Sequence, residues 1–144
     1  MNRITLVILG GVTIGIAGLT FAHTDEKAAE SGEHAKVLAT YDVKEKVEGK
    51  DATVTMVEVN IGPRQAGTAH HHPGSAFVYV IEGTYELGID DQPTKIYKAG
   101  QTFQEPSGAL HRVSRNPASS GNTKLVAVIV HPRSAKEILT PADH

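Results

Sequence analysis

Residues 67–83 of the chain read GTAHHHPGSAFVYVIEG, three consecutive histidines followed by a Pro-Gly turn and a β-branched apolar run. Side chains two residues apart in a strand face the same side, so His70 and His72 share one face and His71 takes the other. Two imidazoles on one face can bind one metal ion through their ring nitrogens. A histidine run beside a turn is also common as an exposed polar segment, so further ligands are needed to favour a metal site.

A third histidine stands in a comparable setting farther along the chain. Residues 100–111 read GQTFQEPSGALH, so that His111 follows a second Pro-x-Gly turn. Two turn-linked histidine segments in one small chain favour a shared metal site over two unrelated polar loops.

Together the two stretches resemble the two motifs of the cupin family, G-x5-H-x-H-x3,4-E-x6-G and G-x5-P-x-G-x2-H-x3-N. The matching residues are His70, His72 and Gly83 for the first motif, and Gly100, Pro106, Gly108 and His111 for the second. Neither Gly62 nor Gly67 has the spacing of the first glycine, and Asn116 comes one residue late. The similarity extends over residues 37–132.

The resemblance implies a single all-β domain, an antiparallel jelly-roll-like barrel (a double-stranded β-helix) with a divalent metal ion inside. In the family, two histidines and a carboxylate of the first motif and the histidine of the second hold this ion. Carried over to this sequence, the metal ligands are His70, His72 and His111. The position of the carboxylate, four residues after His72, is Ala76.

Three interpretations of Ala76 remain open. A site of three neutral imidazoles would keep the full +2 charge of the ion and leave positions for water or substrate. Alternatively, Glu105, six residues before His111 and next to the second turn, replaces the carboxylate. In the third interpretation the metal is lost and the barrel is an empty binding cavity or a packed core.

Period-two alternation after residue 36 independently predicts many short strands. They are expected at residues 37–43, 53–61, 77–81, 85–89, 95–98, 101–105, 111–114 and 124–130. This number and spacing indicates an all-β sandwich or small barrel. The alternation places Ala76, Val78 and Val80 on the inward face. Phe77, Tyr79 and Ile81 lie on the outward face and form an apolar strip, which predicts a homodimer contact.

The N-terminus is typical of an export signal. Arg3 precedes an uncharged run at residues 4–21, and small residues at Thr20 and Ala22 form a cleavage site. We expect a signal peptide at 1–22, or an uncleaved membrane anchor, with export to the periplasm or secretion. A flexible leader at 23–36, the barrel at 37–132 and a C-terminal tail at 133–144 complete the predicted organisation.

Composition excludes several classes of function. The 144 residues suffice for one domain, and the absence of cysteine excludes thiolate catalysis and cysteine metal sites. A formal net charge of −2 argues against nucleic-acid binding and against a basic membrane patch. Contact with a membrane is expected only through an uncleaved segment 1–22.

Two functions follow from the resemblance. One is a small metal-dependent enzyme (dioxygenase, isomerase or lyase type) with Fe, Mn, Ni, Cu or Zn and a small oxygen-rich substrate. In this enzyme Glu105 would be the catalytic acid or base. The other is a non-catalytic cupin that binds a small molecule or a metal.

Overall fold

The computed structural model describes residues 32–142, which contain ten strands and no helix. The strands are β1 (Glu33–Val47), β2 (Lys50–Ile61), β3 (His70–His71), β4 (Ser75–Glu82), β5 (Thr84–Ile89), β6 (Lys95–Lys98), β7 (Thr102–Glu105), β8 (Leu110–Arg115), β9 (Thr123–Pro132) and β10 (Thr140–Pro141). The all-β fold predicted from the sequence is therefore confirmed.

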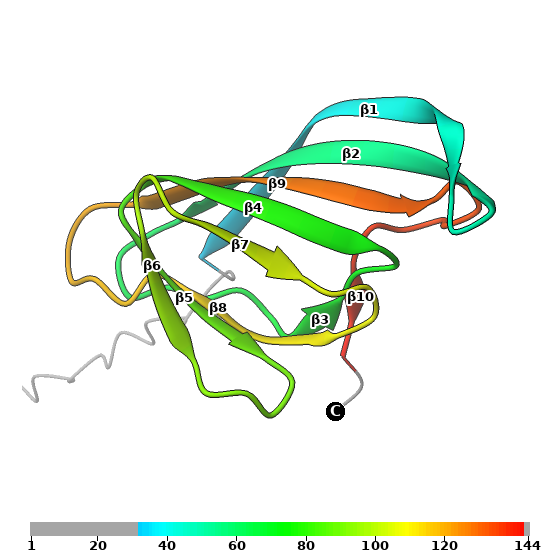
Figure 1. The fold of residues 1–144 in the computed structure, drawn as a ribbon. Coiled ribbons are helices and arrows are strands. Elements are labelled where there is room, and N and C mark those ends of the chain that lie inside the picture. Colours follow the sequence, from blue (N-terminus) through cyan, green and yellow to red (C-terminus); the bar gives the residue numbers. More distant parts are fainter. Residues whose placement is uncertain (1–31, 143–144) are drawn as a thin grey trace, which may run out of the picture.

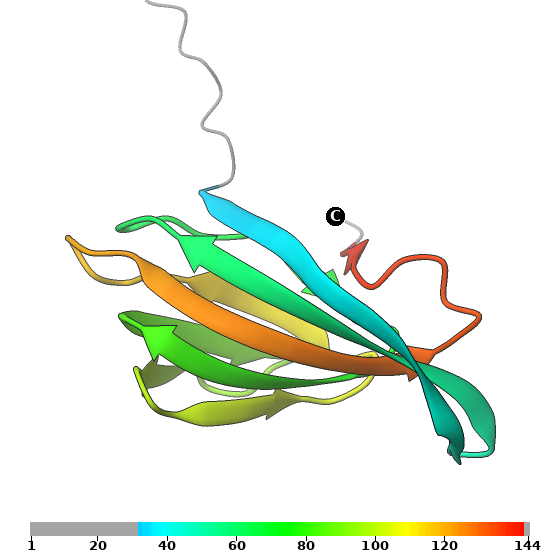
Figure 2. The same ribbon diagram turned by 90° about the horizontal axis from the view of Figure 1, so that it is seen from above.

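The strands form two five-stranded sheets that face each other (Figures 1 and 2). Sheet A has the order β1-β2-β9-β4-β7, and sheet B has the order β10-β3-β8-β5-β6. All strand pairs are antiparallel. No hydrogen-bonded strand pair within residues 32–142 joins the two sheets, so they enclose a core without closing into one continuous barrel.

The core lies between the sheets and follows the period-two pattern of the sequence. On β4 the inward side chains of Ala76, Val78 and Val80 are buried, whereas Phe77 and Tyr79 on the outer face are about half exposed. Strand β9 alternates in the same way along all of its length. Each fully buried aliphatic side chain of this kind contributes roughly 1.5–3 kcal/mol to folding.

The two ends of the described chain carry more structure than the sequence indicates. Strand β1 begins at Glu33, so residues 33–36, which we assigned to the flexible leader, belong to a strand. Residues 140–141 of the tail form β10, which pairs with β3. The C-terminal end consequently reaches the histidine segment, while Glu33 at the other end accepts a hydrogen bond from Ser114.

The predicted signal segment 1–22 lies outside the described residues, as does the start of the leader. Within residues 32–142 no helix has the length and apolar character needed to cross a bilayer.

Candidate metal centre

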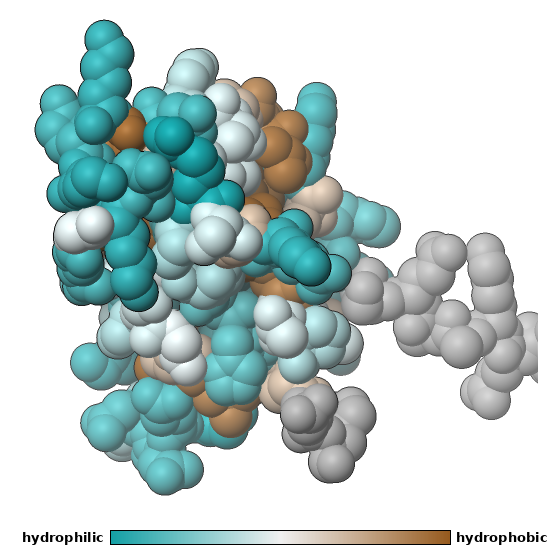
Figure 3. Space-filling model, turned by 90° about the vertical axis from the view of Figure 1, so that its right-hand side faces the viewer, coloured by the Kyte–Doolittle hydropathy of each residue, from teal (hydrophilic) through white to brown (hydrophobic). Residues whose placement is uncertain are grey.

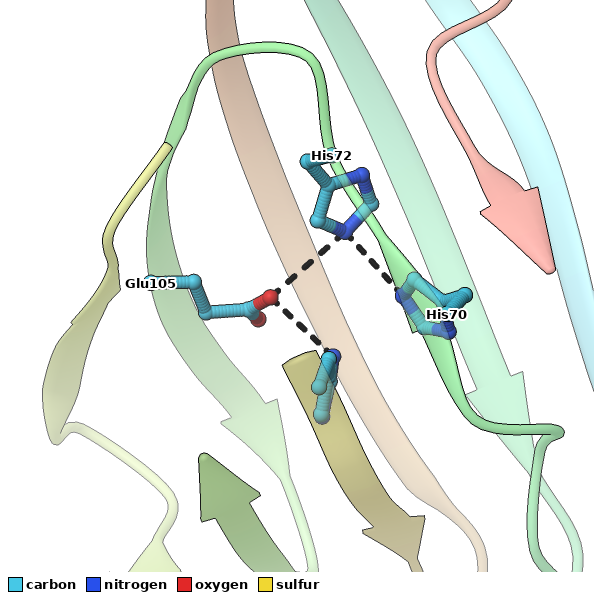
Figure 4. A group of neighbouring side chains, drawn as sticks. His70, His72 and Glu105 are labelled. Atoms are coloured by element: carbon cyan, nitrogen blue, oxygen red, sulfur yellow. Dashed lines mark hydrogen bonds and ion pairs between the residues drawn. The ribbon is translucent and has the colours of Figure 1, made fainter. Parts of the chain in front are cut away.

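Three histidines and one glutamate lie together at one end of the core (Figure 4). His70 lies on β3, His72 directly after it, His111 on β8 and Glu105 at the end of β7. Each offers one nitrogen or oxygen atom, and these four atoms all lie within 4.8 Å of one another. All the residues that we predicted as ligands or as catalytic acid are thus brought together in one cluster.

Strand register explains the convergence. His70 is directly opposite His111 in the β3–β8 pair, which puts both imidazoles on the same face of sheet B. The turn after His72 packs tightly on β9, because Gly74 lies so close to the Val130 carbonyl that a Cβ would be 1.9 Å from its oxygen. Only glycine allows this approach.

Glu105 occupies the place of the missing motif carboxylate by reaching across from the neighbouring strand. In the β4–β7 pair, Glu105 is directly opposite Ala76. Both residues are buried, Ala76 completely. Its Oε2 lies 3.0 Å from His111 Nδ1 and 3.5 Å from His72 Nε2.

Backbone carbonyls fix the orientation of each imidazole. His70 Nδ1 donates to the Thr68 carbonyl at 2.9 Å, and His72 Nδ1 donates to the Ile138 carbonyl at 2.6 Å. His111 uses its other nitrogen, with Nε2 donating to the Val113 carbonyl at 3.0 Å. Since a ring nitrogen facing a carbonyl oxygen must carry the hydrogen, the opposite nitrogen of each neutral ring presents a lone pair to the cluster centre.

These four atoms lack the hydrogens that would satisfy them, and this arrangement fits a metal ion. His70 Nε2 and His72 Nε2 face each other at 3.1 Å, although each nitrogen has only a lone pair to offer. Glu105 Oε2 and His111 Nδ1 are buried without a hydrogen-bond partner. Ligands about 2.0–2.1 Å from a tetrahedral ion lie about 3.3 Å apart, close to the separations found here.

The protonation states of His70 and Glu105 favour the binding of a cation. Burial lowers the pKa of His70 to about 4, so this imidazole is neutral at neutral pH, as a ligand must be. For Glu105, burial alone would raise the pKa. A hydrogen bond with His111 and the attraction between the carboxylate and the histidines in their protonated forms outweigh burial and hold the pKa of Glu105 below its usual range. The carboxylate is therefore ionised and able to bind a metal.

A hydrogen-bonded row extends from His111 away from the cluster, and sequence reasoning missed it. The Tyr85 hydroxyl lies 3.1 Å from His111 Nε2 and donates to Ser114 Oγ, which in turn donates to Glu33. Burial raises the pKa of Glu33, opposed by the bond from Ser114. Nothing in the sequence pattern distinguishes these residues, since Tyr85 reads as a core residue and Glu33 as part of a polar leader.

The cluster and this row border a cavity of about 230 Å³ between the sheets. Its apolar lining consists of Ala35, Val37, Val57, Val59, Val78, Leu125, Ala127, Ile129, Ile138 and Leu139. The remaining lining residues are Glu33, His70, His72, Tyr85, Glu105, His111 and Ser114. The side chains of Val37 and Leu139 are 53% and 37% exposed, which places them at the rim of the cavity.

Comparison with protein families finds a match to the family described as Cupin domain over residues 57–129. Comparison with curated proteins finds no match. An uncharacterised protein with a double-stranded β-helix domain from Klebsiella pneumoniae is similar in structure, with a TM-score of 0.59 and 20% identity over 81% of this chain and 89% of that one.

Two further structures are similar at comparable levels. Oxalate oxidase in complex with the substrate analogue glycolate has a TM-score of 0.56 and 22% identity over 73% of this chain. The match spans about half (53%) of the oxalate oxidase chain. KdgF from a Halomonas species has a TM-score of 0.53 and 20% identity over 73% of this chain and 83% of that one. At these identities the similarity establishes the fold.

Proposed function

Because this chain belongs to the cupin family, we propose that it is a metal-dependent protein whose ion is held by His70, His72, His111 and Glu105. One observation carries the proposal. Four possible ligand atoms lie within 4.8 Å of one another, and two of them, on Glu105 and His111, are buried without a hydrogen-bond partner. An unpaired buried acceptor of this kind costs about 1–3 kcal/mol, a cost that a bound cation removes.

The ligand set restricts the metal without naming it. Imidazole and carboxylate ligands suit Fe, Mn, Ni, Cu and Zn. Three neutral imidazoles and one carboxylate reduce the charge of a divalent ion to +1, so the site remains attractive to an oxygen ligand. When bound, such an ion polarises a coordinated oxygen or lowers the pKa of bound water.

We propose catalysis as the primary role, in a reaction of dioxygenase, isomerase or lyase type on a small molecule. The ligand cluster borders a largely apolar cavity, which supports this role because substrate and ion could meet there with few competing water contacts. Glu105 has two proposed roles, metal ligand and acid or base. The variant Glu105→Gln separates them: loss of metal identifies a ligand, whereas full metal content with lost turnover identifies a proton-transfer group.

Elemental analysis of untagged protein tests the site itself, beside a His70→Ala/His111→Ala double variant. We expect close to one metal ion per chain in the wild type and none in the variant. His34→Ala/His71→Ala is the matched control, because it removes two histidines outside the cluster. A wild type that stays without metal after reconstitution would overturn the proposal.

A non-catalytic binding protein is the second candidate. The largely apolar cavity lining favours it, because few polar groups other than the cluster could orient a reacting molecule. Such a protein would bind metal and ligand but would release the ligand chemically unchanged.

Export and dimer formation complete the proposal. The signal-like segment 1–22 supports export to the periplasm or secretion. Mass spectrometry of the mature protein tests export, and we expect a chain that begins at His23.

The exposed strip of Phe77, Tyr79 and Ile81 on the outer face of sheet A supports a homodimer. Light scattering that gives a monomer at micromolar concentration would count against the dimer.

A further inference from the structure

The polar groups of the cavity form two connected sets and are the smaller part of its lining. They are the four residues of the metal cluster and the row of Tyr85, Ser114 and Glu33, which hydrogen bond to one another. Apart from Glu33 on β1 and Glu105 on β7, sheet A lines the cavity with aliphatic side chains from β1, β2, β4 and β9. A bound molecule would therefore meet hydrogen-bonding groups over the smaller part of its surface and hydrocarbon along the rest.

This lining penalises an oxygen-rich ligand. Each hydroxyl or carboxylate turned towards the valines of β2 would lose its bonds to water without replacement, at roughly 1–3 kcal/mol per group. An apolar body loses nothing there and gains about 25 cal/mol for each Å² removed from water. The apolar lining belongs to the interior: the surface at the end of the molecule where β10 lies is largely hydrophilic, with apolar residues in small groups (Figure 3).

The charges of the metal site and of the cavity lining also do not favour a ligand with several negative charges. The +1 charge that remains at a divalent ion bound by Glu105 attracts one anionic oxygen group. A second carboxylate on the ligand would find no cationic side chain, because no lysine or arginine lines the cavity within the described residues. Glu33, which does line it, would repel such a group when ionised.

The size of the cavity sets a further limit. A volume of about 230 Å³ is below the 300–1,000 Å³ typical of pockets for drug-sized ligands. At about 30 Å³ per molecule it corresponds to roughly seven or eight waters, the volume of a compact molecule with a single ring or a short branched chain.

We propose that the cavity takes a compact, largely apolar molecule that presents one oxygen-based metal-binding group to the ion, in place of the oxygen-rich substrate expected from the sequence. The inference rests on the proposed metal site. It assigns the metal cluster to recognise the head of the ligand, and the aliphatic lining of sheet A to recognise its body.

Hydroxamates test this assignment, because the same metal-chelating group can be attached to substituents of different polarity. Zinc-loaded full-length protein is titrated calorimetrically with benzohydroxamate, acetohydroxamate and 2,3-dihydroxypropanohydroxamate, each corrected for its affinity for free zinc. We expect benzohydroxamate to bind roughly tenfold or more tightly than acetohydroxamate, because its ring is removed from water. The dihydroxypropano compound should bind no more tightly than acetohydroxamate.

A pair of variants on one strand connects the preference to the cavity. Val59→Thr places a hydroxyl of nearly equal volume on the cavity lining and should reduce the benzohydroxamate preference by roughly threefold or more. Val54→Thr makes the same change on the opposite face of β2, where the side chain does not line the cavity, and should preserve the preference. Equal reduction by both variants would contradict the assignment.

The outcomes for the site and for the ligand can be distinguished. Metal content, measured on the same samples, reports on the ligand cluster alone. One zinc per chain with equal affinity for all three hydroxamates, or with preference for the dihydroxypropano compound, overturns the ligand class and leaves the metal site standing. Protein that binds none of the divalent ions of Zn, Ni, Cu, Fe and Mn overturns both.

Discussion

Ala76 and Glu105 are directly opposite each other in the antiparallel β4–β7 pair, and the glutamate carboxylate lies beside His72 and His111. Side chains of opposed residues in neighbouring strands have Cβ atoms about 4.5–5.5 Å apart. A carboxylate can therefore reach nearly the same point from either position. The cluster thus contains three histidines and one acidic residue, as the motif does, but the acidic residue is on the other strand.

The first prediction exchanges these two residues. Glu105→Ala should reduce metal affinity by roughly tenfold or more, because it removes a charged ligand. Adding Ala76→Glu to that variant should restore most of the affinity, since the carboxylate then comes from the motif position. Competition with a chromophoric chelator measures both constants. A double variant as weak as Glu105→Ala alone would show that the two positions are not interchangeable.

The second prediction concerns the C-terminal segment, which reaches back to the site. Deletion of residues 133–144 removes the Ile138 carbonyl that accepts the hydrogen bond of His72 Nδ1. We expect metal affinity to fall roughly 10–100-fold, because His72 would no longer be held in one tautomer and orientation.

A shorter deletion supplies the control for this experiment. Removal of residues 143–144 preserves Ile138 and β10, and should keep the affinity of the full chain. Circular dichroism establishes that both shortened proteins are folded. Equal affinity of all three proteins would assign no role to the segment in metal binding.

The third prediction follows from the low pKa of His70 in metal-free protein. Its folded pKa of about 4 lies below the ordinary value of 6.5, so between these values the unfolded chain binds a proton that the folded chain does not. The free energy of unfolding should therefore fall as pH decreases from about 6.5 to about 4, with a contribution from His70 of about 2 kcal/mol.

Urea unfolding at several pH values in the presence of a chelator measures this slope. In His70→Gln the decrease between pH 6.5 and 4.5 should be smaller than in the wild type, because the group that titrates is gone. His34→Gln, on the exposed part of β1, provides the comparison for loss of one histidine. Identical slopes in wild type and His70→Gln would refute the prediction.

The fourth prediction separates the Tyr85 hydroxyl from its ring. Tyr85→Phe retains the stacking against Phe103 but removes the bonds to His111 and Ser114. We expect unfolding free energy to fall by about 1–2 kcal/mol, since the buried Ser114 hydroxyl loses a donor. Tyr97→Phe, whose ring also packs on Phe103, should change stability less. A larger loss in Tyr97→Phe would contradict the importance of the row.

Several features were predictable because they depend on local pattern. Alternation of apolar and polar residues gave the strands and the inward face of β4. The two-residue separation of His70 and His72 predicted that both imidazoles lie on one face. Each of these signals lies within about ten residues of sequence, where strand geometry alone decides orientation.

Other parts of the site depend on pairing between distant segments, which local pattern does not encode. The opposition of Ala76 and Glu105 depends on the register of β4 and β7, which the intervening strands determine. Glu33 lies in an edge strand with mostly exposed side chains, so its sequence resembles a polar leader. The Ile138 contact uses a backbone oxygen, for which no residue type is required.

The distribution of the ligands over the two sheets has a consequence for mechanical integrity. Glu105 belongs to sheet A, whereas His70 and His111 belong to sheet B, and within residues 32–142 no strand pairing joins the sheets. An ion bound by all of these residues would cross-link sheet A to sheet B. In a chain without cysteine, the metal would thus supply the kind of cross-link that other proteins obtain from a disulfide, and one that a chelator can open.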